Sequence, residues 1–172
     1  MVGSKRLLRI ICFYIQLDSG IKGIRMYHKI LVATDGSSLS QKAVSSAISL
    51  AALTGADLIA IKVIPHYPLS YFEAGLALQA ADVSRIEQQW ADESQSVVDE
   101  VQREAQQLGV KTLTVTVKSD IVSEAIIAAA RKYQCDLIVM ASHGRKGVER
   151  LLLGSETQHV LTHSHIPVLV LR

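Results

Sequence analysis

The sequence predicts an α/β protein with a doubly wound, five-stranded parallel sheet. Three observations support this. Apolar runs of strand length alternate with segments of helical periodicity from residue 26 onward. Two of these runs end in small, polar loops that precede a helix, as strands of such sheets do. The chain has 172 residues and is 49% hydrophobic, which is enough for one domain with a full core.

The alternation defines nine elements. Strands are expected at about 28–34, 58–64, 111–117, 136–141 and 167–171. Helices are expected at about 39–53, 80–108, 122–133 and 154–163. Because strand and helix signals alternate, helices connect successive strands, and the sheet is therefore parallel.

Two of the helices are predicted from their apolar spacing. In the first, the pattern is carried by Ala43, Val44, Ala47, Ile48, Leu50 and Ala51. In the long helix, a stripe at helical spacing consists of Ile86, Trp90, Val97, Val101, Ala105 and Leu108. This helix is expected to end before Gly109, since glycine is favoured just past a helix C-terminus.

Composition excludes several classes of function. The net charge of +2 with 20% charged residues implies no global surface for polyanions. Aromatic residues make up 5%, without basic-aromatic interleaving, so nucleic-acid binding is not expected. Cys12 and Cys135 form no metal or redox spacing, and Cys135 is expected to be a small core residue. We expect a reducing, cytoplasmic setting.

The loop after the fourth strand has the composition of a phosphate cradle. The apolar run Leu137–Met140 leads into Ser142–Gly147, which is small, polar and basic, and Gly154-Ser155 opens the next helix. Glycines let backbone N–H groups approach phosphate oxygens, the helix start offers donors, and Arg145 supplies charge. The alternative is an ordinary strand-to-helix turn with a solvated basic loop, because isolated glycine-rich loops are common.

The first strand ends in a second polar loop, Thr34-Asp35-Gly36-Ser37. In an open parallel sheet, ligands bind beyond the carboxyl ends of strands, where the strand order reverses. The two loops could therefore form the two lips of one crevice. Asp35 would accept a hydrogen bond there, from a ribose hydroxyl or an amino group. Alternatively, it is the N-cap of the following helix.

Three segments resemble a known family. They are Ala33–Ser37, Leu137–Arg145 and the closing stretch that runs from Leu151-Leu152-Leu153-Gly154-Ser155 to Ile166-Pro167-Val168-Leu169-Val170. These segments are similar to the universal stress protein family, and the resemblance covers residues 26–172. ATP-binding members carry a glycine, two residues, a second glycine, nine residues, and then Gly-Ser or Gly-Thr. Gly144, Gly154 and Ser155 keep this spacing, whereas Ala141 occupies the position of the first glycine.

Ala141 and Glu156 depart from the family's pattern. If position 141 needs a left-handed backbone, a Cβ there costs roughly 1–2 kcal/mol, which weakens binding by about 5- to 30-fold. Glu156 stands where the family usually has an apolar residue, and a carboxylate near a triphosphate repels it unless it turns to solvent or Mg²⁺ intervenes. A carboxylate is also simply favoured in a first helical turn.

The resemblance implies a Rossmann-like sheet of strand order 3-2-1-4-5 that binds ATP or a related adenine nucleotide, with Mg²⁺ accompanying the phosphates. Val63 would face the base through its backbone. Met140 and Ala141 would flank the ribose, and the residues after strand four would hold the phosphates. The positions that match the family's contacts are Ala33, Thr34, Asp35, Val63, Met140, Ala141, His143, Gly144, Arg145, Gly154, Ser155, Glu156 and Thr157.

The family also implies a homodimer, and the last strand favours one independently. Residues 167–171 include Val168-Leu169-Val170-Leu171, which is apolar on both faces and stands at a chain end. An uncovered apolar edge strand is a liability that pairing with a second copy would resolve. The alternative is that a helix covers this edge.

Residues 1–25 are expected to lie outside the domain, which would span 26–172. Lys5, Arg6 and the apolar run Ile10–Ile15 faintly suggest a signal peptide, but no small-x-small cleavage site follows, and the run is too short to span a bilayer. We favour Met26 as the true start, because family-like sequence begins there. A surface-bound amphipathic segment is the alternative.

A histidine cluster near the last helix suggests a rival function. His159 and His163 have the i, i+4 spacing that can bind Zn²⁺, with His165 nearby. No glutamate follows the first histidine as in metalloprotease helices, and no cysteine stands near. We expect a helix end with favourably placed histidines rather than a metal site.

Three functions remain open from the sequence. The first is an ATP-binding stress-response module that couples nucleotide occupancy to its dimer or to an unidentified protein partner. The second is a nucleotide-free interaction protein of the same fold, in which Ala141 and Glu156 have closed the site. The third is a slow ATPase or autokinase that uses Ser155 or Thr157. No nucleophile–base–orienter set is recognisable, so a dedicated enzyme is not expected.

Overall fold

The computed structural model describes residues 26–65, 80–144 and 153–172, and in these ranges five strands alternate with four helices. Each element begins and ends within two residues of its predicted bounds. In chain order they are β1 (Lys29–Ala33), α2 (Ser38–Thr54), β2 (Asp57–Ile64), α3 (Ala80–Gln107), β3 (Thr112–Lys118), α4 (Val122–Lys132), β4 (Leu137–Ala141), α5 (Ser155–His163) and β5 (Val168–Leu171).

The five strands form one parallel sheet of order β3-β2-β1-β4-β5, which confirms the predicted fold class and strand order. The chain moves outward from β1 to β3 and then returns to place β4 on the other side of β1. The strand order therefore reverses between β1 and β4, and ligands of such sheets bind at the carboxyl ends of these two strands.

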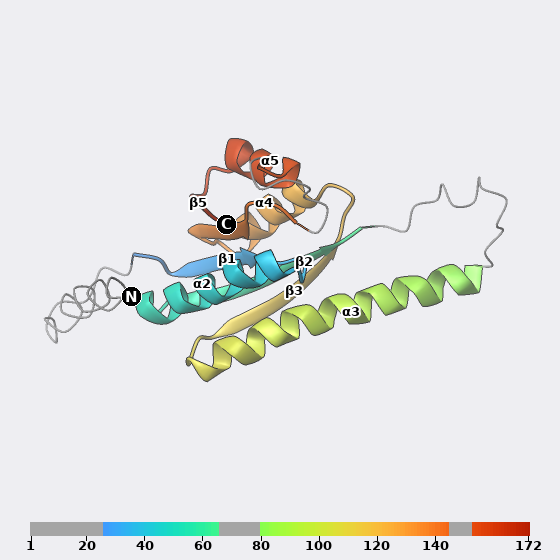
Figure 1. Ribbon diagram of the computed structural model, residues 1–172, viewed down its shortest axis with the longest axis horizontal. Coiled ribbons are helices and arrows are strands. Elements are labelled where there is room, and N and C mark those ends of the chain that lie inside the picture. The colour runs from blue at the N-terminus through green and yellow to red at the C-terminus, as the bar shows by residue number, and fades with distance from the viewer. Residues whose placement is uncertain (1–25, 66–79, 145–152) are drawn as a thin grey trace, which may run out of the picture.

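Helices cover both faces of the sheet. α2 and α3 pack on one face, and α4 and α5 lie together on the other (Figure 1). The central strands β1 and β4 are apolar on both faces because both faces are covered. Ile30 and Val32 of β1 belong to the core under α2, whereas Leu31 belongs to the core under α4 and α5. All three side chains are fully buried.

The predicted face of the long helix needs a correction. Val98 is fully buried, whereas the predicted Val97 is only partly so, and Leu108 is 58% exposed. The buried positions Ser94, Val98, Val101 and Ala105 keep helical spacing, so the stripe was displaced by one residue at its centre. Gly109 ends the helix with a left-handed φ of 71°, as predicted.

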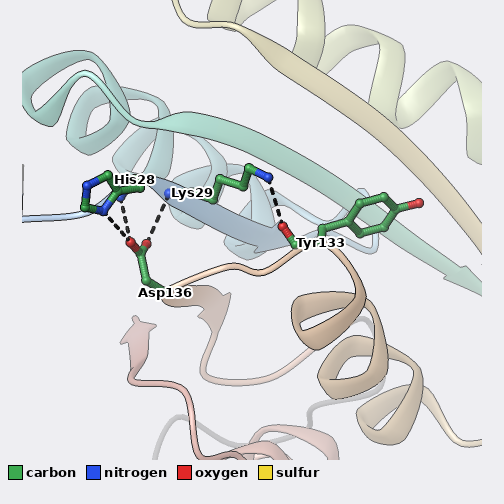
Figure 2. Close-up of polar contacts among 4 residues, drawn as sticks. All are labelled: His28, Lys29, Tyr133 and Asp136. Carbon is green, nitrogen blue, oxygen red and sulfur yellow. Dashed lines mark hydrogen bonds and ion pairs between the residues drawn. The ribbon is translucent and has the colours of Figure 1, made fainter.

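Asp136 joins the beginnings of β1 and β4 at the amino end of the sheet (Figure 2). Its Oδ2 accepts hydrogen bonds from the backbone N–H of His28 at 2.7 Å and lies 3.2 Å from the Nδ1 atom of the same residue. Its Oδ1 accepts from the N–H of Lys29 at 3.2 Å, and the Lys29 ammonium donates to the carbonyl of Tyr133. This network lies at the opposite end of the strands from the predicted crevice.

Residues 1–25, which were predicted to lie outside the domain, are not among the described residues. In the ranges that the structure describes, no helix combines the length and the apolar composition that a bilayer span requires.

Candidate functional site

The first lip of the crevice is the loop that follows β1. Thr34 is buried, and its N–H donates to the carbonyl of Ile61 at 3.0 Å, which is the last contact between β1 and β2. Its Oγ1 lies 3.1 Å from the hydroxyl of Ser40 and accepts from the N–H of Gly36. These bonds place the loop firmly at the carboxyl end of the sheet.

Asp35 projects from this lip. Its Oδ1 accepts from the N–H of Ser37 at 2.9 Å. The N-cap of α2 is Ser37, whose side chain accepts from the N–H of Ser40. Of the two roles that the sequence allowed for Asp35, helix capping therefore belongs to Ser37, and Asp35 stands one turn before the helix.

The second lip follows β4. Ser142 is 1% exposed, its N–H donates to Leu171 of β5, and its carbonyl accepts from Gly154 at 2.8 Å. Its hydroxyl lies 3.1 Å from Nδ1 of His143, but a side chain buried this deeply cannot serve as a nucleophile for a solvent-borne substrate. The hydrogen bond between Ser142 and Gly154 therefore holds this lip against the start of α5.

The two lips meet at Gly144 and Asp35. A Cβ added to Gly144 would lie 2.8 Å from Oδ2 of Asp35, so the Asp35 carboxylate would have to turn away to make room for it. The φ of Gly144 is not among the positive values of the described residues. The glycine therefore leaves room for the Asp35 carboxylate between the lips, and no left-handed backbone is involved.

Gly154 has a similar role at the start of α5. It is the N-cap residue, with φ −61° and ψ 147°, a conformation open to any residue. A Cβ there would lie 3.2–3.3 Å from His143 and the Ser142 carbonyl. The absence of a side chain lets the α5 N-terminus approach the second lip, and the backbone N–H groups of Ser155 and its neighbours lie at that helix end.

Ala141 is an extended strand residue, not a left-handed one. It is the last residue of β4, pairs with Leu171, is 8% exposed and has no positive φ. From the sequence, a Cβ at position 141 was expected to weaken binding only if the backbone there were left-handed. The backbone is extended and accepts alanine without strain, so this loss of binding free energy does not arise.

Glu156 and Thr157 are occupied elsewhere in the fold. Oε2 of Glu156 accepts from the N–H of Ser123 at 2.7 Å, at the start of α4. Thr157 is 3% exposed, and its hydroxyl donates to the carbonyl of Ala141 at 3.0 Å. The side chains of both residues thus stabilise the packing of α5, and what they can offer a ligand is their backbone.

The remaining predicted residues lie around the same edge. Ala33 ends β1, and Met140 is buried in the core under α4 and α5. In β2, Asp57 donates its N–H to β1 and Ile61 accepts from β1, so the odd-numbered residues present their backbone groups to that side. Val63 keeps this direction beyond the end of β1, which is the direction that the sequence predicted for its backbone. Arg145 lies outside the described residues.

One residue at the crevice was missed by the sequence reasoning. The ammonium of Lys62 donates to the carbonyl of Asp35 at 2.8 Å. The available signal was a single charged residue inside the apolar run of strand two, near its carboxyl end.

The two histidine rings of α5 stack on each other and do not point their nitrogens at a common position. The rings of His159 and His163 stack with centroids 3.9 Å apart and planes 8° apart, and Nδ1 of His163 lies 3.0 Å from the carbonyl of His159. Parallel stacked rings cannot both direct a nitrogen lone pair at one ion without turning. Among the described residues, no three metal-ligating side chains come together.

The structure defines a Rossmann-like α/β protein whose strand order reverses between β1 and β4. The sequence model of the Universal stress protein family matches residues 26–172. The chain belongs to this family.

Individual relatives agree with this assignment. Universal stress protein MJ0531 of Methanocaldococcus jannaschii is 34% identical over 167 residues, which covers 96% of this chain and 94% of that protein. The aligned part of this chain is longer than residues 26–172, so the similarity extends into the first 25 residues.

Solved structures show the same fold. The structure of MJ0577, from the same organism, has a TM-score of 0.71 at 27% identity and covers 85% of this chain and 96% of that chain. A universal stress protein solved in complex with cAMP has a TM-score of 0.59 at 24% identity and covers 85% of this chain and 97% of that one. At that identity the likeness shows the fold alone.

Proposed function

We propose that this protein is a cytoplasmic stress-response module that binds ATP, accompanied by Mg²⁺, in the crevice between β1 and β4 and acts as a homodimer. The observation that carries the nucleotide proposal is the meeting of Asp35 and Gly144 at the switch point, beside the N-terminus of α5. An acceptor on one lip and backbone donors at a helix start on the other match a ribose and a phosphate chain.

The described residues divide into three groups in this proposal. Asp35 accepts from a ribose hydroxyl, with Ala33 and Thr34 shaping the wall beside it. The backbone of Val63 borders the base, and Met140 and Ala141 end the strand beneath the ribose. The phosphates lie against backbone N–H groups at His143, Gly144 and the first turn of α5, namely Ser155, Glu156 and Thr157. Gly154, whose own N–H donates to Ser142, contributes by having no side chain in the way.

Two observations favour this proposal over a nucleotide-free protein. The two residues that argued for a closed site were Ala141 and Glu156. Ala141 has an unstrained extended backbone, and the carboxylate of Glu156 is hydrogen bonded to α4. Neither residue therefore requires the crevice to be empty. Mg²⁺ would be held mainly by phosphate oxygens and water, as is usual for this ion.

The test is a titration of purified protein with ATP and Mg²⁺, followed by calorimetry and native mass spectrometry. Wild-type protein should bind about one ATP per chain. Asp35→Asn removes a charged acceptor, so its affinity should fall by about 10- to 100-fold, since a hydrogen bond to a charged group contributes about 1.5–3 kcal/mol.

Asp57→Asn is the matched control. It makes the same chemical change at the amino end of β2, where Asp57 forms only an exposed ion pair with Lys111 at 3.6 Å. Its ATP affinity should equal that of wild type. Wild-type protein that stays bare at millimolar ATP would exclude the proposal and favour the nucleotide-free alternative, with a protein partner as its ligand. Phosphate release or labelling of Ser155 from γ-labelled ATP would add slow turnover to binding.

A further inference from the structure

Lys62 lies where β2 loses its neighbour β1. The last residue pair of that ladder is Ala33 with Ile61, but β2 continues to Ile64 and pairs there only with β3. Lys62 is the first residue beyond the ladder. Its side chain follows that of Ala60 onto the face that α2 covers, because successive side chains of a strand alternate between faces.

The ammonium of Lys62 replaces a ladder contact at this point. The carbonyl of Asp35 comes after the end of β1, where the strand pairing no longer reaches it. Nζ of Lys62 donates to that carbonyl at 2.8 Å. A side chain thus continues the connection between β2 and the first lip after the backbone contacts have ended.

The hydrogen bond from Lys62 holds Asp35, whose carboxylate faces Gly144 of the second lip. One oxygen of the Asp35 carboxylate accepts from Ser37, and the other approaches Gly144 so closely that a Cβ there would lie 2.8 Å away. A shift of the Asp35 backbone would move this carboxylate and change its distance to Gly144. A change at Lys62 would therefore move Asp35 and, with it, alter the contact between the first lip and the second.

We propose that Lys62 is a positioning residue that holds the Asp35 lip in its binding geometry and so sets the affinity for the adenine nucleotide. This inference rests on the proposed function for its effect on affinity, but its structural part is independent of any ligand. A half-buried lysine inside an otherwise apolar strand is otherwise unexpected, because an ammonium is costly to remove from water without a partner.

The first test is made without nucleotide, on the ¹H–¹⁵N spectrum of the full chain. Lys62→Met keeps the packing of the aliphatic stem but removes the donor. The amide signals of Gly36, Ser37 and Gly144 should shift in this variant and return towards their wild-type positions in Lys62→Arg. Lys111→Met, at the other end of the sheet, should leave these three signals in place. Unchanged signals in Lys62→Met would overturn the proposal.

The second test is calorimetry with ATP and Mg²⁺ on the same variants. Lys62→Met should bind about 10-fold more weakly, Lys62→Arg within about threefold of wild type, and Lys111→Met like wild type. Equal affinities of Lys62→Met and wild type would overturn the proposal. If wild-type protein does not bind ATP, the proposed function fails, and the spectra alone decide whether Lys62 positions the lip.

Discussion

At the scale of single residues, the hydrogen bond of Glu156 accounts for a carboxylate beside the proposed phosphate site. The N-cap residue of α4, Ile121, makes no side-chain cap, and Glu156 supplies the missing acceptor to the Ser123 N–H at 2.7 Å. A carboxylate at the N-terminus of α4 is also favoured by the helix dipole. The same charge is thereby directed at a neighbouring helix rather than at a ligand.

Glu156→Ala should therefore lower the free energy of unfolding by about 0.5–2 kcal/mol, the usual cost of a lost helix cap. Glu156→Gln keeps an acceptor oxygen and should lose less. Urea unfolding measures both effects, and calorimetry should show that Glu156→Gln changes ATP affinity by less than about threefold, within about 0.7 kcal/mol. A tenfold gain in affinity would show that the carboxylate repels the phosphates after all.

Cys135 provides a prediction with a defined pH range. The pKa of its thiol is raised from 9.0 to about 11, chiefly by burial; the Lys29 charge lowers the pKa and the Asp136 charge raises it, and both are included in this value. Between pH 9 and 11 the unfolded chain loses this proton while the folded chain keeps it. Stability should therefore fall as the pH rises through this window, by about 1.4 kcal/mol per unit for this group alone.

The measurement compares urea unfolding of wild type and Cys135→Ala at several pH values from 8 to about 11. Other groups titrate in both proteins, so only the difference between them reports on Cys135. The wild type should lose stability more steeply above pH 9. Parallel curves would mean that the thiol ionises equally well in the folded state.

Asp35 and Gly144 show how far residue-level prediction from the sequence reached. Their places at two strand ends follow from hydrophobic patterning. The family-like segment Ala33–Ser37 singles out Asp35, and the family's glycine spacing singles out Gly144. The reason for the glycine does not follow, because the contact that an added Cβ would make with Asp35 at 2.8 Å depends on how two loops far apart in the chain meet. Lys62 was missed for the same reason, since its partner is a backbone carbonyl in the loop that follows a different strand.

At the scale of elements, the register of β1 against β4 depends on Asp136. Its carboxylate accepts from the N–H groups of His28 and Lys29 before the ladder between the two strands begins at Ile30 and Leu137. This fixes where β1 starts, and through the rigid strand it also fixes where Thr34 and Asp35 emerge at the other end.

Asp136→Ala should lower the free energy of unfolding by about 1–3 kcal/mol, because it removes the acceptor of two backbone donors. The loss stays moderate because the carboxylate is 37% exposed and water can reach part of the site. Asp57→Asn breaks only an exposed ion pair and should cost less than about 1 kcal/mol. Chemical denaturation compares the two, and equal losses would show that Asp136 is an ordinary surface carboxylate.

Element boundaries followed well from the sequence, whereas the buried face of α3 did not. Strands here are apolar runs bounded by polar loops, so their limits are visible. A helix face is set by which residues meet the sheet, and Val97 and Val98 are chemically identical candidates for it. Only the packing against β2 and β3 selects Val98.

At the scale of the whole molecule, the sheet has β5 as one of its two edges, as the sequence predicted. Leu169 is 39% exposed on this strand, and Leu161 of α5 is 41% exposed. An edge strand with exposed leucines is a template for pairing with another chain. This supports the proposed homodimer through residues 167–171, although α5 also contacts β5.

The hydrogen-bond pattern between β4 and β5 identifies a substitution that would disturb pairing at the outer edge of β5 without breaking its bonds to β4. The carbonyls of Pro167 and Leu171 accept hydrogen bonds from β4, so the odd-numbered residues of β5 face β4. Val168 and Val170 therefore present their N–H groups to the outer edge. Val170→Pro removes one outward donor and leaves the bonds to β4 in place, and proline is tolerated on an edge strand in this position.

Val170→Pro should convert the dimer to a monomer in light scattering after size exclusion, at concentrations where wild type is dimeric. Thr116→Pro is the matched control on the opposite edge, because the carbonyl of Lys111 faces β2 and the even-numbered residues of β3 point outward. It should leave the dimer intact. If β5 forms the interface, only Val170→Pro separates the chains. A dimer that survives Val170→Pro would show that the interface lies on another surface. A monomeric wild type would exclude the homodimer.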